Sequence, residues 1–180
     1  MYPKLIKPYV RSFCRGISRA DPIWVPCQPA PDKPLLECFS IVPEHITAHG
    51  GIQHLGWAIW EWRKVLIEAE FHAVWEHPSG ELFDLTPRAF SLEKILFLPD
   101  PYKKYRGLRI DNIRKALTRD KDIERFIVLH GCLFAETNRT VLPDYYGIFE
   151  GSSKAMAIRY EMEILEARLR VRFGAPGTTT

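Results

Sequence analysis

The sequence predicts an α+β fold in which an antiparallel sheet packs on one helix and the C-terminal third is helical. A helical pattern over residues 38–49 is followed by segments with strand-like composition at 57–62, 65–75 and 81–86. Residues typical of turns separate these segments, which indicates antiparallel strands. Apolar residues at spacings of three and four then predict a last helix over 154–173.

The length and composition predict one domain. With 180 residues, of which 46% are hydrophobic, the chain can bury one sizeable core. We expect a single globular domain over residues 1–173 that consists of three sections and is followed by a tail. The three sections are a Pro-rich irregular wrap at 1–37 with a short helix around 4–14, a core at 38–88 and a mostly helical part at 89–173. The tail at 174–180 is expected to be disordered.

The charges and cysteines exclude several classes of function. The 25 basic residues are interspersed with 22 acidic ones, so we expect no nucleic-acid partner. No apolar run approaches the roughly 20 residues that span a bilayer, so we expect no membrane association and a cytoplasmic location. The four cysteines form no CxxC pair, so we expect free thiols and no cofactor.

Residues 38–49 have the pattern of a short helix that begins with a cysteine. Apolar residues recur at helical spacing, and a pair of glycines follows, which is a normal helix stop. Pro43 fits this helix only if the first turn begins near Phe39 or Ser40, because proline lacks the N–H that later turns need. Cys38 therefore lies at the helix start.

The strand pattern at 65–75 separates its side chains into two faces. One face consists of Val65, Ile67, Ala69, Phe71, Ala73 and Trp75. The other consists of Leu66, Glu68, Glu70, His72 and Val74. The first face is the more apolar and is expected in the core, so the second is expected to point into a cleft or solvent. By the same rule Asp84 shares the second face.

The turn between the last two strands decides whether His72 and Asp84 meet. A three-residue turn at 78–80, with glycine in the left-handed position, places Trp75 opposite Phe83. It also places His72 diagonal to Asp84. A two-residue turn would place core residues opposite cleft residues, which the two-residue period of a strand excludes.

Cys38, His72 and Asp84 are the residue types of a thiol-nucleophile site. A helix N-terminus stabilises a thiolate, which is the attacking form of cysteine. A histidine can accept the thiol proton, and a carboxylate can hold the imidazole in the correct tautomer. Each residue also has an ordinary structural interpretation: a small buried residue, a hydrogen-bonded surface histidine and a turn aspartate.

The segments that carry these residues resemble a known superfamily. A helix that opens with Cys38, a strand containing EFHAVW and the segment GELFDLTP resemble the core of transglutaminase-like and papain-like cysteine proteins. HAVWEHPSGELFDLTP is especially similar to the transglutaminase-like form, and the likeness extends to bacterial proteins with GW-x-IW followed by EAEFHAVW. The resemblance covers about residues 35–88. It implies a papain-like topology with Cys38 as nucleophile, His72 as general base and acid, and Asp84 as the orienting group.

Three further residues are candidates for binding the substrate or the oxyanion. The Gln28 side chain can supply an N–H beside the backbone amide of Cys38. Glu70, on the expected cleft face, can tune His72 or bind a cationic group. Trp57 can stack on a ligand, although aromatic residues at strand spacing are more often core.

Metal binding is an alternative interpretation of the same strand. Glu68, Glu70 and His72 lie on one face at a spacing of two and could ligate a divalent cation together with His77 or a distant residue. Ligands from a single strand rarely complete a metal site, so we predict no metal-binding residues.

These observations favour cysteine-dependent acyl transfer or amide hydrolysis on a protein or peptide substrate. Peptidase, deamidase and transglutaminase-like reactions all remain open. The competing hypothesis is a non-enzymatic module that binds a protein partner on the same scaffold. The apolar stripe of the last helix is expected to dock on the core, with a homodimer contact as the alternative. It consists of Ile158, Met162, Leu165, Leu169 and Phe173.

Overall fold

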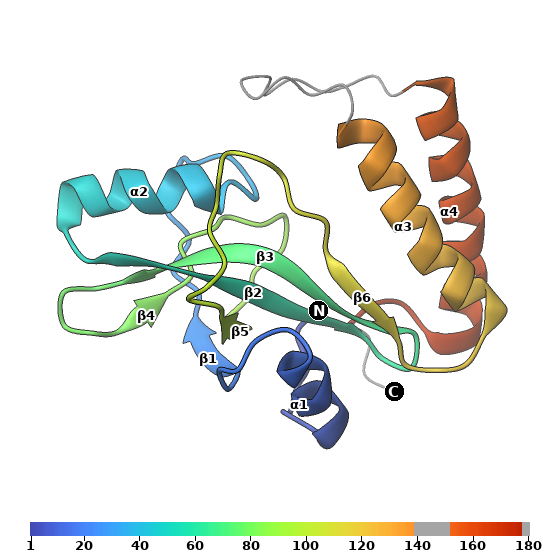
Figure 1. Cartoon of the computed structure of the whole chain (residues 1–180), viewed down its shortest axis with the longest axis horizontal. Helices are drawn as coiled ribbons and strands as arrows, with labels where there is room; N and C mark the ends of the chain where they lie inside the picture. Colours follow the sequence, from blue (N-terminus) through green and yellow to red (C-terminus); the bar gives the residue numbers. More distant parts are fainter. Residues whose placement is uncertain (139–151, 178–180) are drawn as a thin grey trace. The chain divides into compact units, whose positions relative to one another are not determined.

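The structure is a computed structural model that describes residues 1–138 and 152–177, and it has the α+β architecture with an antiparallel sheet (Figure 1). The helices of the described residues are α1 Pro8–Arg15, α2 Cys38–His49, α3 Lys121–Asn138 and α4 Ser153–Phe173. The strands are β1 Ile23–Pro26, β2 Ile52–Trp62, β3 Leu66–Glu76, β4 Leu82–Phe83, β5 Lys94–Pro99 and β6 Ile113–Ala116.

The contacts of the chain divide it into two compact units. The first unit contains residues 2–60 and 69–105, and the second contains Met1, residues 61–68 and the described residues from 106 onward. The long hairpin of β2 and β3 contributes residues to both units, which a division by contiguous sequence sections could not anticipate.

The strands are hydrogen-bonded in the order β1-β5-β2-β3-β4, and β6 pairs with β3. The two ends of this order also meet, because the Cys27 and Asp84 backbones form a parallel bridge. The Asp84 N–H donates to the Pro26 carbonyl oxygen, and the Gln28 N–H donates to the Asp84 carbonyl oxygen, both at 2.9 Å. The bridge therefore fixes Asp84 beside the strand that is farthest from β4 in the sheet order.

The helix predicted over residues 38–49 forms with the same bounds, as α2. It ends at Gly50, whose φ of 73° is one that glycine adopts easily. Pro43 differs from the expectation, because the helix begins at Cys38 and the proline lies beyond the first turn. The helix accommodates it by giving up the hydrogen bond that residue 43 would donate to the Phe39 carbonyl.

The predicted register of the hairpin between β3 and β4 is confirmed. Trp75 pairs with Phe83 and Glu76 pairs with Leu82. The three-residue turn is closed by the His77 N–H, which donates to the Glu81 carbonyl oxygen, and Gly80 has a φ of 92°. The turn thus fixes which side chains of the two strands meet.

The expectation that the second face of β3 is open was wrong. Val74 on this face is buried in a cluster with Val25, Ala58, Ile95 and Phe97. Three of these partners come from β1 and β5, two strands that the sequence did not predict. β5 was missed because its apolar residues are consecutive rather than alternating, which is typical of a strand buried on both faces.

The second unit contains α3 and α4, which pack along each other (Figure 1). The predicted apolar stripe of α4 docks on this core with α3, as expected. α4 is capped by Ser152, whose hydroxyl accepts a hydrogen bond from the Ala155 N–H. Strand β6 lies within the section 89–173 that was expected to be mostly helical. Part of the predicted disordered tail, 178–180, lies outside the described residues.

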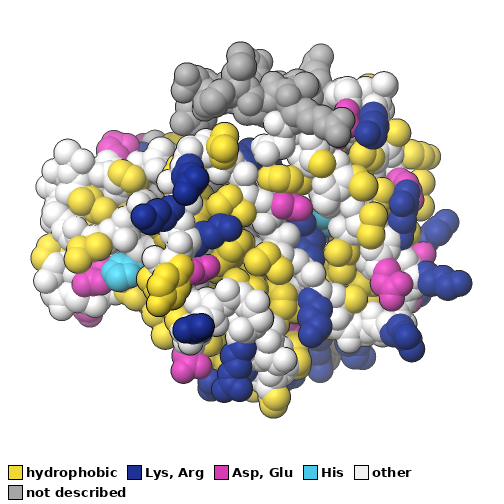
Figure 2. Space-filling view, viewed as in Figure 1, with side chains coloured by type: hydrophobic (Ala, Val, Ile, Leu, Met, Phe, Trp, Pro, Cys, Tyr) yellow, Lys and Arg dark blue, Asp and Glu magenta, His cyan; other side chains and the backbone are white. Residues whose placement is uncertain are grey.

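The visible surface carries side chains of both charge signs. On the face seen in Figure 2, Lys and Arg side chains lie among acidic and apolar ones. None of the helices in residues 1–138 and 152–177 combines the length and apolar content needed to cross a bilayer.

Candidate functional site

Cys38 is the first residue of α2 and is held between two segments that flank the other candidate residues. Its side chain belongs to an apolar cluster with Ala73 and Leu85, the chain neighbours of His72 and Asp84. Cys38 is 3% exposed. The sequence positions α2 in this way because Cys38, Ile41 and Val42 recur on one helix face and bury together.

The start of α2 leaves backbone N–H groups available. The first backbone hydrogen bonds at this end are donated by Ser40 and Ile41 to the Glu37 carbonyl oxygen, and Glu37 supplies no side-chain cap. The amides of Cys38 and Phe39 precede these donors and have no acceptor within the helix. They are oriented as the donors of an anion site at a helix N-terminus.

Leu36 connects the start of α2 to the segment that follows Asp84. Its N–H donates to the Pro87 carbonyl oxygen at 3.1 Å, and its φ is +64°. A leucine in the left-handed region is strained, so the surrounding contacts must hold it. The sequence patterns did not predict this conformation of Leu36 or its hydrogen bond.

His72 and Asp84 form a buried pair. The His72 Nε2 lies 2.9 Å from the Asp84 Oδ1, and the two side chains are 2% and 0% exposed. The Thr86 N–H also donates to Oδ1, at 3.0 Å. The diagonal placement derived from the turn therefore brings the two residues into direct contact, as predicted.

The pair favours an imidazolium beside a carboxylate. Burial alone would lower the pKa of His72, but the Asp84 charge, the Cys38 charge and hydrogen bonds to both raise that pKa to about 10. Burial alone would raise the pKa of Asp84, but His72, Arg88 and a hydrogen bond with Thr86 lower that pKa to about 2. Both shifts describe the same attraction within one buried group.

The Cys38 sulfur lies close enough to His72 to act on its protonation. Both the charge of a Cys38 thiolate and a hydrogen bond to it raise the pKa of His72. Because Nε2 is bound to Asp84, Nδ1 is the ring nitrogen available to the sulfur. The His72 ring is therefore held by Asp84 through Nε2 and is also influenced by the charge of Cys38.

Two residues that the sequence reasoning missed contact the second oxygen of Asp84. The Cys27 Sγ lies 3.9 Å from Oδ2, and the Arg88 Nη2 lies 3.6 Å from it. Burial and the Asp84 charge raise the pKa of Cys27 to about 12, so this thiol is a poor nucleophile. The sequence could not predict that Cys27 lies beside Asp84, because this contact depends on the backbone bridge between the two residues.

Arg88 extends the polar group to Glu70. Its side chain is 6% exposed, its Nη1 lies 3.7 Å from the Glu70 Oε2, and the guanidinium stacks 4.7 Å from the Trp60 ring centre. The Trp60 Nε1 donates to the same carboxylate oxygen at 2.7 Å. Glu70 therefore acts on His72 only through Arg88 and Asp84, and is not placed against the imidazole as the sequence suggested.

The other two predicted binding residues have different outcomes. Gln28 lies beside Asp84 through its backbone hydrogen bond, and the residue is exposed. Trp57 is buried, and its Nε1 donates to the Asp100 Oδ2 at 3.0 Å. Trp57 also packs on Phe71 in the core, so it offers no open face to a ligand.

The side chains of the metal alternative do not converge. Glu68 is bound by Arg114 at 2.8 Å, while Glu70 and His72 are paired with Arg88 and Asp84. Among residues 1–138 and 152–177, no group of three His, Cys, Asp or Glu side chains is arranged to hold a metal ion.

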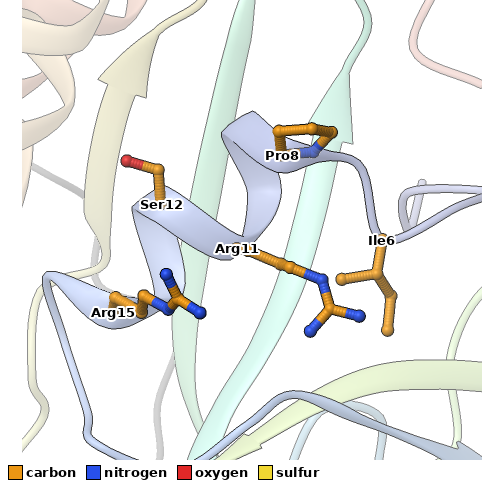
Figure 3. A pocket seen from close by; sticks show the side chains of 5 residues that line it. All are labelled: Ile6, Pro8, Arg11, Ser12 and Arg15. Carbon is orange, nitrogen blue, oxygen red and sulfur yellow. The ribbon is translucent and has the colours of Figure 1, made fainter.

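A pocket on α1 contains none of the Cys-His-Asp residues. It is lined by Ile6, Pro8, Arg11, Ser12 and Arg15 (Figure 3). Arg11 also forms an exposed ion pair with Asp21 at 3.7 Å. This pocket therefore adds nothing to the chemistry of Cys38.

No protein family, curated protein or solved structure was found to match this chain. The resemblance to transglutaminase-like and papain-like proteins stays a prediction from the sequence segments that carry it. The case for a function rests on the contacts of Cys38, His72 and Asp84.

Proposed function

We propose that this protein catalyses acyl transfer or hydrolysis at an amide or thioester carbon, with Cys38 as nucleophile on a papain-like, transglutaminase-like scaffold. The observation that carries the proposal is the buried 2.9 Å contact between His72 Nε2 and Asp84 Oδ1, which leaves Nδ1 to the Cys38 sulfur. A nucleophile, a base and a group that orients the base are the minimum for this chemistry.

The first step forms an acyl-enzyme. His72, whose pKa is raised, holds the proton of the pair as imidazolium, and the Cys38 thiolate attacks the carbonyl carbon, which becomes tetrahedral. The C–N or C–S bond to the leaving group then breaks, and His72 gives its proton to that group. Asp84 keeps its charge throughout and holds the imidazole in place.

The second step releases the acyl group. Water, or an amine in transamidation, attacks the thioester carbon while its proton moves to His72. The C–S bond breaks, and the proton stays on His72 beside the Cys38 thiolate. In both steps the backbone N–H of Cys38 is a donor for the developing oxyanion, since the start of α2 has no side-chain cap. Gln28 supports this role only if its exposed side chain turns toward the sulfur.

One observation favours the competing, non-enzymatic function. Cys38 and His72 are 3% and 2% exposed, so a substrate must displace covering side chains to reach the sulfur. Phe39, which follows Cys38, stacks on Tyr105 at 4.0 Å between ring centres. A scaffold that binds a protein partner would need no access to this thiol.

The experiment is acylation by a small activated ester. The full chain is mixed with p-nitrophenyl acetate, release of p-nitrophenol is followed, and the acetylated residue is located by peptide mass spectrometry. We expect a burst with the acetyl group on Cys38, no burst in Cys38→Ala, and a burst slowed by roughly 100-fold or more in His72→Gln, as loss of a general base predicts.

The chain supplies its own controls. Burial raises the pKa of Cys14 to about 11, and that of Cys27 is about 12, so both thiols should stay unmodified. Cys132 is exposed and reports the reactivity of an ordinary thiol. Acetylation of Cys38 no faster than of Cys132, or a burst that persists unchanged in His72→Gln, would refute the proposed chemistry and favour the interaction module.

A further inference from the structure

α4 carries a second apolar stripe, which is separate from the stripe that docks on the core with α3. Its members follow one another at alternating spacings of three and four residues, and each is exposed. They are Ala157, Tyr160, Ile164, Ala167 and Val171. This is the a/d spacing of a coiled coil. Val171, at 88% exposed, shows how little of the stripe is covered.

The stripe lies on the face of α4 opposite the one that packs on α3. Ile158, Leu165 and Leu169 are buried in the core of the second unit. At 100° per residue, these positions lie about 140° around the helix from the centre of the exposed stripe. The predicted homodimer contact through the docked stripe is therefore excluded, because α3 occupies it, while the exposed stripe is available.

The charges beside the exposed stripe indicate what covers it. One flank carries Glu161 and, seven residues later, Arg168. The other flank carries Glu163 and, seven residues later, Arg170. When two copies of the helix run antiparallel, each flank faces the same flank of the partner, which runs in the opposite direction. The Glu of each flank then lies opposite the Arg of the same flank in the partner.

The ion pairs that two of these side chains form within one chain do not prevent contacts with a second chain. Glu161 binds Arg125 at 2.7 Å and Arg170 binds Glu166 at 2.6 Å. All four side chains are at least one third exposed, and pairs of this kind contribute little to stability. Glu163 and Arg168 form no ion pair with any residue in the described part of the chain.

We propose that the exposed stripe of α4 binds the same stripe of a second copy of this chain, in antiparallel orientation. The layers then place Ile164 against the partner's Ala167 and Tyr160 against the partner's Val171, so that a large residue meets a smaller one in each layer. The stripe spans about 21 Å at 1.5 Å per residue. A contact of this length is small, so the dimer dissociates on dilution.

The test is sedimentation equilibrium of the full chain over a range of concentrations. We expect the apparent mass to rise from the monomer value of 20.9 kDa toward twice that value. Ile164→Lys should weaken the dimer by roughly tenfold or more, because a charge then lies in the seam. Val128→Lys is the matched control, since Val128 is an exposed apolar residue on α3, outside the stripe. Circular dichroism confirms that both variants are folded.

Charge reversal tests the orientation. Glu163→Arg places like charges opposite Arg170 of the partner subunit and should weaken the dimer, and adding Arg170→Glu should restore it. Adding Arg168→Glu instead should not, because only a parallel pair brings residues 163 and 168 together. Three results would each overturn the proposal. The chain could stay monomeric at all concentrations, or Val128→Lys could weaken the dimer as much as Ile164→Lys does. The third is that Arg168→Glu restores the dimer of Glu163→Arg and Arg170→Glu does not.

Discussion

Removing the charge of Asp84 should change how the stability of this protein depends on pH. Asp84→Asn keeps the size of the side chain and removes the carboxylate that His72 Nε2 contacts at 2.9 Å. Arg88 keeps Glu70 as a partner at 3.7 Å, so the substitution does not leave the guanidinium without a counter-charge. The perturbation is therefore directed at the pair itself.

The magnitude follows from the pKa of Asp84, which falls from 3.8 to about 2 in the folded protein. Since a tenfold change in a protonation equilibrium corresponds to about 1.4 kcal/mol, the carboxylate contributes roughly 2–3 kcal/mol to the free energy of unfolding. The raised pKa of His72 describes the same attraction and is not added. Removal of one partner from a buried pair costs about 3–5 kcal/mol at neutral pH, because the other partner is left uncompensated.

The contribution of the pair to stability is lost both at low pH and at high pH. The Asp84 pKa is lowered by folding, so its contribution is present above about pH 4 and is lost as the pH falls toward 2. The His72 pKa is raised by folding, so its contribution is present below about pH 6.5 and is lost as the pH rises toward 10. The difference in stability between wild type and Asp84→Asn should therefore be largest between these limits.

Urea unfolding of both proteins from pH 2 to 10 measures this difference. A difference that is constant across the whole range would refute the argument, since it would show that Asp84 carries no buried charge. A double-mutant cycle with His72→Gln completes the test. The coupling energy between the two positions should be well above the 0.3–0.5 kcal/mol or so within which independent sites add.

Two substitutions, each with a matched control, test local features of the fold. Gly51→Ala should destabilise the protein by about 1–3 kcal/mol more than Gly80→Ala, because a methyl at Gly51 would overlap the Glu76 carbonyl oxygen and the Trp75 indole, whereas one at Gly80 has no atom within 4 Å. Both glycines have a φ of +92°, so equal losses in thermal unfolding would contradict the packing argument. Ser152→Ala should cost about 1 kcal/mol through loss of the α4 cap, and Ser153→Ala should cost little; the reverse order in urea unfolding would contradict the assignment of the cap.

The parts of the fold that the sequence predicted are those specified by local rules. The helix at 38–49 was delimited by a cysteine, apolar spacing and two glycines, and α2 has the same bounds. The register of β3 and β4 followed from one glycine turn and the period of a strand. Such rules act over a few residues, so neither depends on the rest of the chain.

The parts that the sequence missed depend on contacts between distant segments. β1 and β5 pair with each other and bury the face of β3 that carries His72, yet neither shows the alternation by which a strand is recognised. The same limit applies to the site. His72 and Asp84 were predicted together because one hairpin joins them, whereas Cys27 and Arg88 reach Asp84 only after the sheet has formed.

The cost of this buried polar group bears on what it is for. Glu70, Arg88, Asp84 and His72 form a line of contacts next to a cluster of Val74, Ile95 and Phe97, which fills the same interior with apolar side chains. Replacing a buried ion pair with apolar residues is often neutral or stabilising, so stability alone does not account for the polar residues. An orienting role for Asp84 does account for them. Arg88 helps to lower the pKa of Asp84, and in the proposed reaction the ionised carboxylate would hold the His72 ring toward the Cys38 sulfur.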